Sequence, residues 1–327
     1  MTGLLIEARE EIWPLKQPCR ISRGSRSEAR VVVVRVSDGQ HTGRGEAVPI
    51  ARYDQSCASV LAQIESMKGL PSLDRQGIQK LLAPGAARNA LDCALWDLEA
   101  KVSGKRAWEL ANIPIVPEVE TSFTISLDAV DKMAAAAKAA ANSPLLKLKL
   151  GGDELDLARV EAVRGAAPTA RLLIDANESW SPSHYRKIVP ALNGLGVDLI
   201  EQPFPADADE VLETLEHPIP VCADESCHTT ADLPRLRNRY EMLNVKLDKT
   251  GGLTEALLLT ERARETGFKL LIGCMVCTSL GIAPARLLAS AADYVDLDGP
   301  LLLGRDRDYR LTYRDGKIGM PPRELWG

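Results

Sequence analysis

Eight short apolar runs separated by longer amphipathic stretches constrain the fold of this 327-residue chain more than any other feature. The runs recur about every 25 residues from residue 121 onward, a spacing typical of strand–helix units. Strands that alternate with helices form parallel sheets, and eight such units favour a (β/α)8 barrel or a close variant. We therefore predict an α/β fold built on a TIM barrel, with strands at 121–125, 145–150, 171–175, 197–201, 220–224, 242–246, 269–274 and 293–296.

The residues before this repeat show mixed strand and helix patterns and predict a smaller α+β domain. The β-branched run 31–36 (VVVVRV) and the segment 42–48 resemble two strands around the turn Asp38-Gly39. Residues 86–102 carry apolar side chains at helical spacing, and Trp96 on this stripe is expected to lie in the core.

Two prolines in 112–118 indicate a linker between the two parts. We therefore expect one domain at 1–112 and a barrel domain at 113–304. The strand–helix repeat ends after residue 300, and residues 305–327 are expected to return to the first domain and complete it. The chain is longer than a typical domain with a single hydrophobic core, which agrees with two domains.

The charge pattern argues against several classes of protein. The net charge is −5 and both signs are spread along the chain, so neither nucleic acid nor a membrane surface is expected as a partner. The longest apolar run, around 270–277, is far too short to cross a bilayer. The first residues carry acids where a signal peptide needs a cationic start, so we expect a cytoplasmic protein.

Two short motifs carry little functional weight. Gly43-x-Gly45 is a lone GxG, which is weak evidence for nucleotide binding and more typical of a close backbone approach. Cys274-x-x-Cys277 has no second pair at zinc-finger spacing, which argues against a structural zinc site.

Polar residues stand where the predicted barrel strands end. The carboxyl ends of parallel strands meet at one mouth, where barrel enzymes place their chemistry, so these residues form the candidate active site. Three carboxylates on neighbouring strands lie between lysines on either side, in a chain with only 14 lysines. The set comprises Lys147, Lys149, Asp175, Glu201, Asp224 and Lys246, followed by Asp296 and Asp298 on the last strand.

The three clustered carboxylates predict a metal site. They would repel one another, and a set of oxygen ligands favours a single Mg²⁺ over zinc. Lysines near such a cation, and near each other as Lys147 and Lys149 are, would have lowered pKa values and could serve as bases. A polarised carboxylate with a base on each face of the adjacent carbon suits proton abstraction, with the metal stabilising an enediolate.

Each of these residues also has a purely structural explanation. A carboxylate at the end of a strand often caps the following helix, and a lysine pair is often solvated on an edge strand. A protein that keeps the fold and only binds a small molecule is a further alternative, although binding alone needs no base on each face. The occurrence of such residues on five consecutive strand–helix units favours the catalytic interpretation.

In these motifs the chain resembles the enolase superfamily, in its muconate-lactonizing-enzyme subgroup. The resemblance implies an α+β N-terminal capping domain, a modified (β/α)7β barrel and a Mg²⁺-dependent active site. It also implies that Asp175 in IDAN, Glu201 in EQP and Asp224 in ADES are the metal ligands.

The lysine motifs match the same subgroup. Lys149 of the K-x-K motif and Lys246 in NVKLDKTGG are implied as the acid–base pair on opposite faces of the substrate. Lys147 is implied as the residue that lowers the pKa of its neighbour, whereas no catalytic part is implied for Lys249.

The last strand indicates the substrate. Asp296-Leu297-Asp298 resembles the DxD motif of dipeptide epimerases, in which two carboxylates hold the α-ammonium group of the dipeptide. The stretches RGSRSEARVVVV, DANESW and YEMLNVKLDKTGGLTEAL are similar to those of bacterial L-Ala-D/L-Glu epimerases. The resemblance therefore implies interconversion of L-Ala-D-Glu and L-Ala-L-Glu, in the recycling of murein peptides.

Recognition of a glutamate side chain requires a cation near the cavity. The arginines that lie where the specificity loops of the family fall are Arg20, Arg23, Arg26 and Arg52. We expect Arg23, Arg26 and Thr124 to bind the substrate. In some relatives the key arginine would align on Gly24, so the match fails at that position.

Other reactions of the subgroup are the alternatives. They are epimerisation of other dipeptides, o-succinylbenzoate synthesis and N-acylamino acid racemisation. Substrates of the last two reactions lack the ammonium group, and two carboxylates would repel them. Homo-oligomers are common in the superfamily, so a homo-oligomer is a further expectation.

Overall fold

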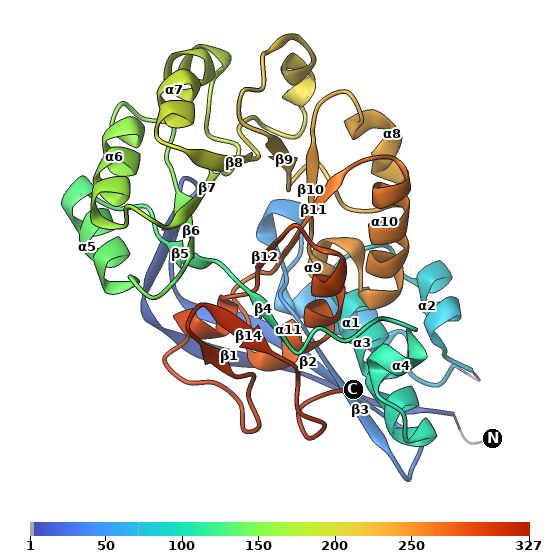
Figure 1. Ribbon diagram of the computed structural model, residues 1–327. Coiled ribbons are helices and arrows are strands. Elements are labelled where there is room, and N and C mark those ends of the chain that lie inside the picture. The colour runs from blue at the N-terminus through green and yellow to red at the C-terminus, as the bar shows by residue number, and fades with distance from the viewer. Residues whose placement is uncertain (1–2, 71) are drawn as a thin grey trace.

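The computed structural model describes residues 3–70 and 72–327. Its largest part is an eight-stranded parallel sheet whose strands follow chain order (Figure 1). The strands are β5 (Phe123–Ile125), β6 (Leu145–Lys149), β7 (Arg171–Asp175), β8 (Val197–Glu201), β9 (Val221–Ala223), β10 (Met242–Val245), β11 (Lys269–Gly273) and β12 (Tyr294–Asp296). Each strand lies within one of the eight predicted runs, so the predicted barrel is confirmed.

The first and last strands approach each other and nearly close the sheet. The Ser122 N–H, immediately before β5, donates to the Val295 carbonyl of β12 at 2.8 Å. The Leu297 N–H donates to Thr121 Oγ1 at 2.9 Å. These bonds bring the end of β12, which carries Asp296, beside the first strand of the barrel.

Helices cover the outside of the barrel (Figure 1). They are α5 (Val130–Ala139), α6 (Asp156–Ala166), α7 (Pro182–Gly194), α8 (Leu233–Leu236), α10 (Leu253–Glu265) and α11 (Ser279–Leu288). The short helix α9 (Leu247–Thr250) instead follows β10 at the mouth of the barrel. Helix α7 begins at Ser181 because the Ser181 hydroxyl accepts from the His184 N–H at 3.1 Å and Pro182 suits the first turn. In the part of the chain that the structure describes, no helix is long and apolar enough to cross a membrane.

The connection from β8 to β9 departs from the expected regular alternation. It forms only the 3-10 helix η2 (Asp209–Thr214), because prolines near both of its ends restrict a longer helix: Pro203, Pro205, Pro218 and Pro220. Other short 3-10 segments are η3 (Thr230–Asp232), η4 (Ala289–Ala291) and η5 (Gly299–Leu302).

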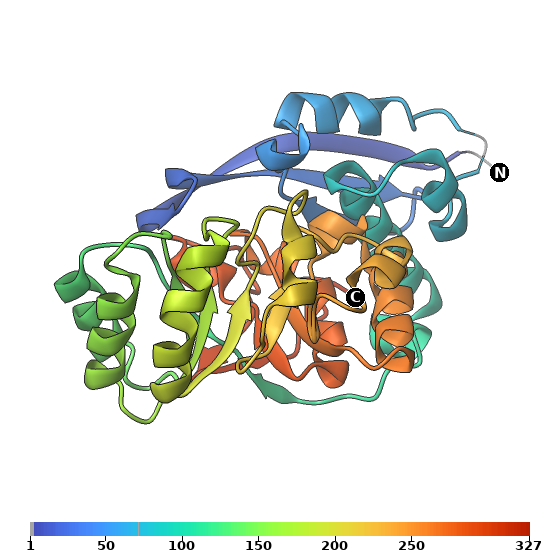
Figure 2. The same cartoon turned by 90° about the horizontal axis from the view of Figure 1, so that it is seen from above.

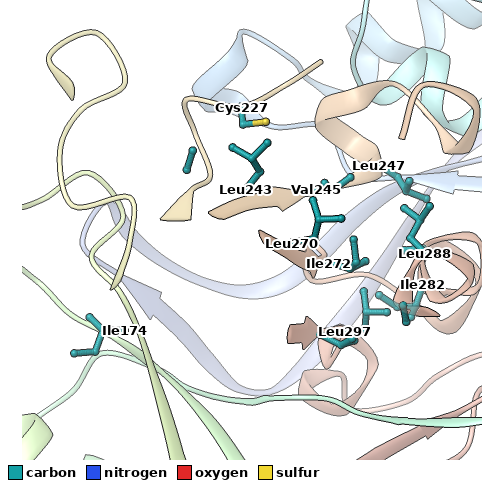
Figure 3. Packing of buried hydrophobic residues seen from close by; sticks show 14 of the residues in the cluster. Ile174, Cys227, Leu243, Val245, Leu247, Leu270, Ile272, Ile282, Leu288 and Leu297 are labelled. Atoms are coloured by element: carbon teal, nitrogen blue, oxygen red, sulfur yellow. The ribbon is translucent and has the colours of Figure 1, made fainter. Parts of the chain in front are cut away.

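Side chains of each barrel strand alternate between the outside and the inside of the barrel. On the outside, residues such as Leu243 and Ile272 pack in one cluster with Ile282 of α11 (Figure 3). On the inside, a small apolar cluster contains Leu145, Leu173, Leu199, Cys222, Met242 and Leu271. Because the period of a strand is two, the residues two or four positions further along also face inward, and they include the predicted polar residues.

Among the described residues, a three-stranded antiparallel sheet and four helices form the cap, which lies across one end of the barrel (Figure 2). The strands are β1 (Leu5–Ile21), β2 (Gly24–Ser37) and β3 (Thr42–Ala47). The helices are α1 (Cys57–Glu65), α2 (Arg75–Leu81), α3 (Ala86–Ser103) and α4 (Ala107–Leu110), with the 3-10 turn η1 (Ala51–Tyr53). The two predicted cap strands and the predicted helix are confirmed, and Trp96 is buried as expected.

Strand β3 and helix α3 lie in close contact because two glycines of β3 face the helix. A Cβ atom on Gly43 would lie 2.0 Å from the Ala94 carbonyl oxygen, and one on Gly45 would lie 2.0 Å from that of Ala90. The close backbone approach predicted from the GxG motif is therefore confirmed.

The chain after the barrel runs back to the cap. Strands β13 (Tyr313–Arg314) and β14 (Lys317–Gly319) form a small antiparallel sheet with β4 (Glu118–Glu120). Beyond it, the Trp326 indole donates to the Cys93 carbonyl at 3.0 Å, and the Gly327 N–H donates to Asp97 Oδ1 at 2.8 Å. Both acceptors belong to α3. The domain boundaries at 112/113 and 304/305 stay a prediction.

Candidate active site

A cavity of about 440 Å³ opens between the cap and the carboxyl ends of the barrel strands. Residues from both parts of the molecule line it. The predicted site residues among them are Arg23, Arg26, Thr124, Lys147, Lys149, Asp224, Lys246, Asp296 and Asp298. Asp175 and Glu201 are fully buried beside Asp224.

The three carboxylates of Asp175, Glu201 and Asp224, here called the carboxylate trio, form a tight buried group. Each offers an oxygen, and these oxygens all lie within 4.8 Å of one another. The residues meet because β7, β8 and β9 are neighbours, with Asp175 paired to Glu201 in register. Burial and the adjacent Asp175 raise the pKa of Glu201 to about 8. Such a set of crowded, buried oxygens fits a hard divalent cation such as Mg²⁺.

Lysines surround the carboxylate trio. Lys149 Nζ lies 2.5 Å from Asp175 Oδ2, and Lys246 Nζ lies 2.6 Å from Asp224 Oδ2. These lysines come from β6 and from the residue directly after β10, and three strands of the barrel lie between them. In a sheet that closes after eight strands, this separation places them on opposite sides of the mouth. The arrangement can hold an amine on each face of a bound substrate.

Lys147 is buried on the inner side of the same strand as Lys149. Its Nζ lies 2.7 Å from Asp296 Oδ2 and 2.7 Å from Glu201 Oε2. Lys147 therefore links the carboxylate trio to the DxD motif of the last strand.

Neighbouring carboxylates raise the pKa values of two lysines at the barrel mouth. Burial acts to lower the pKa of Lys147, but Asp296 and Glu201 outweigh it and raise that pKa well above normal. Burial likewise acts to lower the pKa of Lys246, and Asp224 and Glu201 raise it. The expected lowering refers to lysines beside a bound cation, and it stays a prediction, because without that cation each amine faces carboxylates that raise its pKa.

Two further residues fix Asp224, and sequence reasoning missed both. Lys249, which carried no expected part, is buried, with Nζ 2.6 Å from Asp224 Oδ1 and 3.0 Å from the Asn244 carbonyl. Gln202 Oε1 accepts from the Asp224 N–H at 2.8 Å. A signal for Lys249 was present, because a lysine three residues after Lys246 returns to the same side of a helical turn.

The DxD motif places two unlike carboxylates beside the cavity. Asp296 accepts from the Ser122 hydroxyl at 2.5 Å and from Lys147 at 2.7 Å, so each of its oxygens has a partner. Asp298 Oδ2 accepts from the Thr124 N–H at 2.6 Å. Burial and the adjacent Asp296 raise the pKa of Asp298 to about 7. Asp298 is thus the carboxylate with more capacity for a new cationic partner.

The four candidate arginines differ in their partners. Arg23 and Arg52 line the cavity but form ion pairs with glutamates of the barrel loops. Arg20 points elsewhere, with Nη1 3.7 Å from Asp128 Oδ1 on the exposed surface. Arg26 lines the cavity and forms no ion pair with any residue that the structure describes.

Family models match both parts of the chain. Residues 5–111 match the N-terminal domain of mandelate racemase / muconate lactonizing enzyme, and residues 130–323 match the enolase C-terminal domain-like family. The chain belongs to the enolase superfamily. This assignment agrees with the barrel, the cap and the charged residues at the barrel mouth.

Two curated proteins resemble the chain over nearly its whole length. The L-Ala-D/L-Glu epimerase of Escherichia coli is 47% identical over 319 residues, which cover 96% of this chain and 98% of that protein. The N-acetyl-D-glutamate racemase of a Pseudoalteromonas species is 45% identical over 305 residues, covering 91% and 95%. The chain, like these relatives, is an isomerase.

Two solved structures resemble the chain over nearly its whole length. An enolase family member from Agrobacterium tumefaciens, with homology to dipeptide epimerases and with bound sodium and L-Ala-L-Glu, is 48% identical with a TM-score of 0.96. The match covers 99% of this chain and 100% of that one. The dipeptide epimerase of Methylococcus capsulatus, complexed with Mg and L-Arg-D-Lys, is 30% identical with a TM-score of 0.90, covering 96% of each chain.

Proposed function

We propose that the chain is a Mg²⁺-dependent dipeptide epimerase that interconverts L-Ala-D-Glu and L-Ala-L-Glu. The observation that carries this proposal is the placement of Lys149 and Lys246 on opposite sides of the buried carboxylate trio. A base on each side of one carbon is what inversion of that carbon requires, whereas binding alone requires neither. The sequence resemblance supports a part in murein peptide recycling.

The carboxylate trio would hold one Mg²⁺ in this proposal. When bound, the ion supplies positive charge to the terminal carboxylate of the substrate as the α-proton leaves. Neutralising the trio would also remove the influence that raises the pKa of Lys246. An amine with a lower pKa can lose its proton and accept one from the substrate.

The proton transfers are assigned to the two lysines. One of Lys149 and Lys246 removes the proton from the α-carbon of the C-terminal residue, and the other returns a proton to the opposite face. Lys249 and Gln202 hold Asp224 in place during this exchange.

The two ends of the dipeptide have different partners in the cavity. We assign its α-ammonium group mainly to Asp298, because Ser122 and Lys147 already occupy the oxygens of Asp296. We assign its glutamate carboxylate to Arg26, since Arg23 is paired with Glu178 and Glu225. Thr124 contributes its backbone N–H to Asp298, and its side chain lies in the cavity wall.

Hydrogen–deuterium exchange tests the proposed reaction. In deuterated buffer with Mg²⁺, proton NMR should show loss of the glutamate α-proton signal starting from either L-Ala-L-Glu or L-Ala-D-Glu. A chelator should stop this exchange. Absence of exchange from both epimers would refute the two-base mechanism.

N-acetylglutamate is the informative competing substrate, because one relative is named for its racemisation. It lacks the ammonium group that Asp298 would bind. Faster exchange with N-acetylglutamate than with the dipeptides would contradict the substrate assignment and leave the two-base mechanism intact.

A further inference from the structure

Glu178, in the loop after β7, binds both cap segments that border the cavity. Its Oε2 accepts from Arg23 Nη1 at 2.9 Å and from Arg52 Nε at 3.0 Å. Its Oε1 accepts from Arg52 Nη2 at 3.0 Å. Arg23 lies at the turn between β1 and β2, and Arg52 lies in η1, so one carboxylate joins two separate parts of the cap.

The barrel holds this carboxylate firmly. The Ala206 N–H donates to Glu178 Oε1 at 2.9 Å, and the Glu178 N–H donates to the Gln202 carbonyl at 2.9 Å. The side chain of Glu178 is only 7% exposed. Its φ angle is 65°, in the left-handed region that a glutamate seldom adopts. Such backbone strain persists only where surrounding contacts hold it, and it is typical of ligand clamps.

Glu178 is not available to a substrate or a metal. A carboxylate has about four acceptor positions, and Arg23, Arg52 and the Ala206 N–H supply four donors to Glu178. Its contribution must therefore act through the residues that it holds.

The residues held by Glu178 stand beside the cavity wall. Arg26 lies three residues after Arg23 in the same hairpin, and Tyr53 directly follows Arg52; both line the cavity. Arg23 has two more links to the barrel, with Nη1 2.8 Å from the Asn177 carbonyl oxygen and Nη2 2.6 Å from Glu225 Oε1. Arg52 forms ion pairs with Glu178 alone among the residues that the structure describes.

We propose that Glu178 is a positioning residue that clasps both cap segments over the substrate cavity and thereby sets substrate affinity. These ion pairs of Glu178 with Arg23 and Arg52 are here called the clasp. Without the clasp, each cap segment would move away from the barrel more often, and only a fraction of molecules would present Arg26 and Tyr53 to the substrate. Apparent affinity falls by that fraction. The effect on affinity rests on the proposed function, whereas the clasp itself does not.

The test compares Glu178→Gln with wild type. The amide keeps the acceptor for the Ala206 N–H but removes the charge that binds two guanidinium groups. We expect KM for L-Ala-L-Glu to rise about tenfold or more, with kcat changed by less than about threefold. Limited trypsin digestion should cut faster after Arg26 and Arg52, a readout that requires no turnover.

Arg30→Gln is the matched control. Arg30 lies in the same hairpin and also pairs with two glutamates, with contacts of 2.8 Å to Glu10 and to Glu28, but it is remote from the cavity. This variant should keep the wild-type KM and the wild-type cleavage rate after Arg26 and Arg52.

Arg52→Gln and the double variant Glu178→Gln/Arg52→Gln measure the energetic coupling between Glu178 and Arg52. If Glu178 acts through Arg52, the double variant should have a KM close to that of Glu178→Gln, and the two single effects should not add. If Glu178→Gln misfolds, Arg52→Gln replaces it as the test of the clasp, since the Arg52 side chain is 43% exposed and its loss leaves the barrel intact.

Unchanged KM and unchanged cleavage after Arg26 and Arg52 in Glu178→Gln would overturn the proposal. Where that variant misfolds, unchanged KM and unchanged cleavage after Arg26 in Arg52→Gln would overturn it. If the wild-type protein shows no turnover of dipeptides, the proposed function fails separately. Digestion would then still decide whether the clasp exists.

Discussion

Lys149 and Lys246 hold different carboxylates of the trio, which gives them separable parts in the proposed reaction. Replacing either lysine by alanine should lower epimerisation about 1,000-fold, because one general base is lost. Each variant should still exchange the α-proton of one epimer, the one that the remaining lysine faces. Proton NMR in deuterated buffer checks this, and equal loss of exchange from both epimers in both variants would count against the assignment.

The ionisation of Asp298 predicts how dipeptide binding depends on pH. Its pKa of about 7 means that the carboxyl is neutral below this pH and charged above it. The affinity for L-Ala-L-Glu should therefore weaken about tenfold for each pH unit below 7, and calorimetry measures it. N-acetylglutamate, which is an anion without an ammonium group, should show the opposite trend. A dipeptide affinity independent of pH would contradict the assigned contact.

The charged residues at the barrel mouth could be predicted from the sequence, but the residues that hold them in place were not predicted. Asp175, Glu201 and Lys246 could be found because each follows an apolar run at a strand end. Lys249 and Glu178 act through contacts with residues distant in the chain, such as Asp224 and Arg52. No local pattern encodes the contacts of Glu178, and for Lys249 the local signal is its spacing of three residues from Lys246.

The barrel strands were predictable as elements because burial on both faces makes them apolar. Strand β1 is the counterexample: seven of its 17 residues are polar, two more are Pro14 and Pro18, and few of its side chains are buried. It is an edge strand whose pairing with β2 depends on the whole cap sheet. The segment η2 was expected to be a helix, and its flanking prolines explain the difference.

The close contact between β3 and α3 predicts that a side chain at Gly45 destabilises the protein. Gly45→Ala should destabilise the protein by at least about 2 kcal/mol, because the added methyl group would overlap the Ala90 carbonyl. Gly165→Ala in α6 is the control: nothing lies within 4 Å of its added Cβ, and alanine favours a helix by up to about 1 kcal/mol. Chemical denaturation of both variants measures the difference. Equal stabilities would show that β3 and α3 can move apart at little cost.

The joint between cap and barrel predicts how the stability of the whole molecule depends on pH. Asp248 Oδ1 accepts from the Val48 N–H and from Asn89 Nδ2 of the cap, both at 2.8 Å. Burial raises the pKa of Asp248 to about 7. The folded protein therefore keeps a proton that the unfolded chain releases near about pH 4, so stability falls as pH rises between these values.

Asp248→Asn should remove this dependence. The amide oxygen still accepts from the Val48 N–H and from Asn89 but carries no charge. At about pH 8 the variant should exceed wild type by at least about 1 kcal/mol, since one pKa unit corresponds to about 1.4 kcal/mol. Thermal unfolding across pH measures the effect, with Asp131→Asn on the exposed surface as control. A wild-type curve that stays parallel to the variant curve would disprove it.

The return of the chain to α3 limits how caps can be exchanged between related enzymes. Residues 1–112 look like a cassette that could carry substrate preference from one relative to another. However, Trp326 and Gly327 bond to Cys93 and Asp97, more than two hundred positions earlier in the chain. A chimera made with residues 1–112 alone would pair one protein's helix with another protein's closing segment. Transplanting specificity therefore requires two crossovers, one on each side of the barrel.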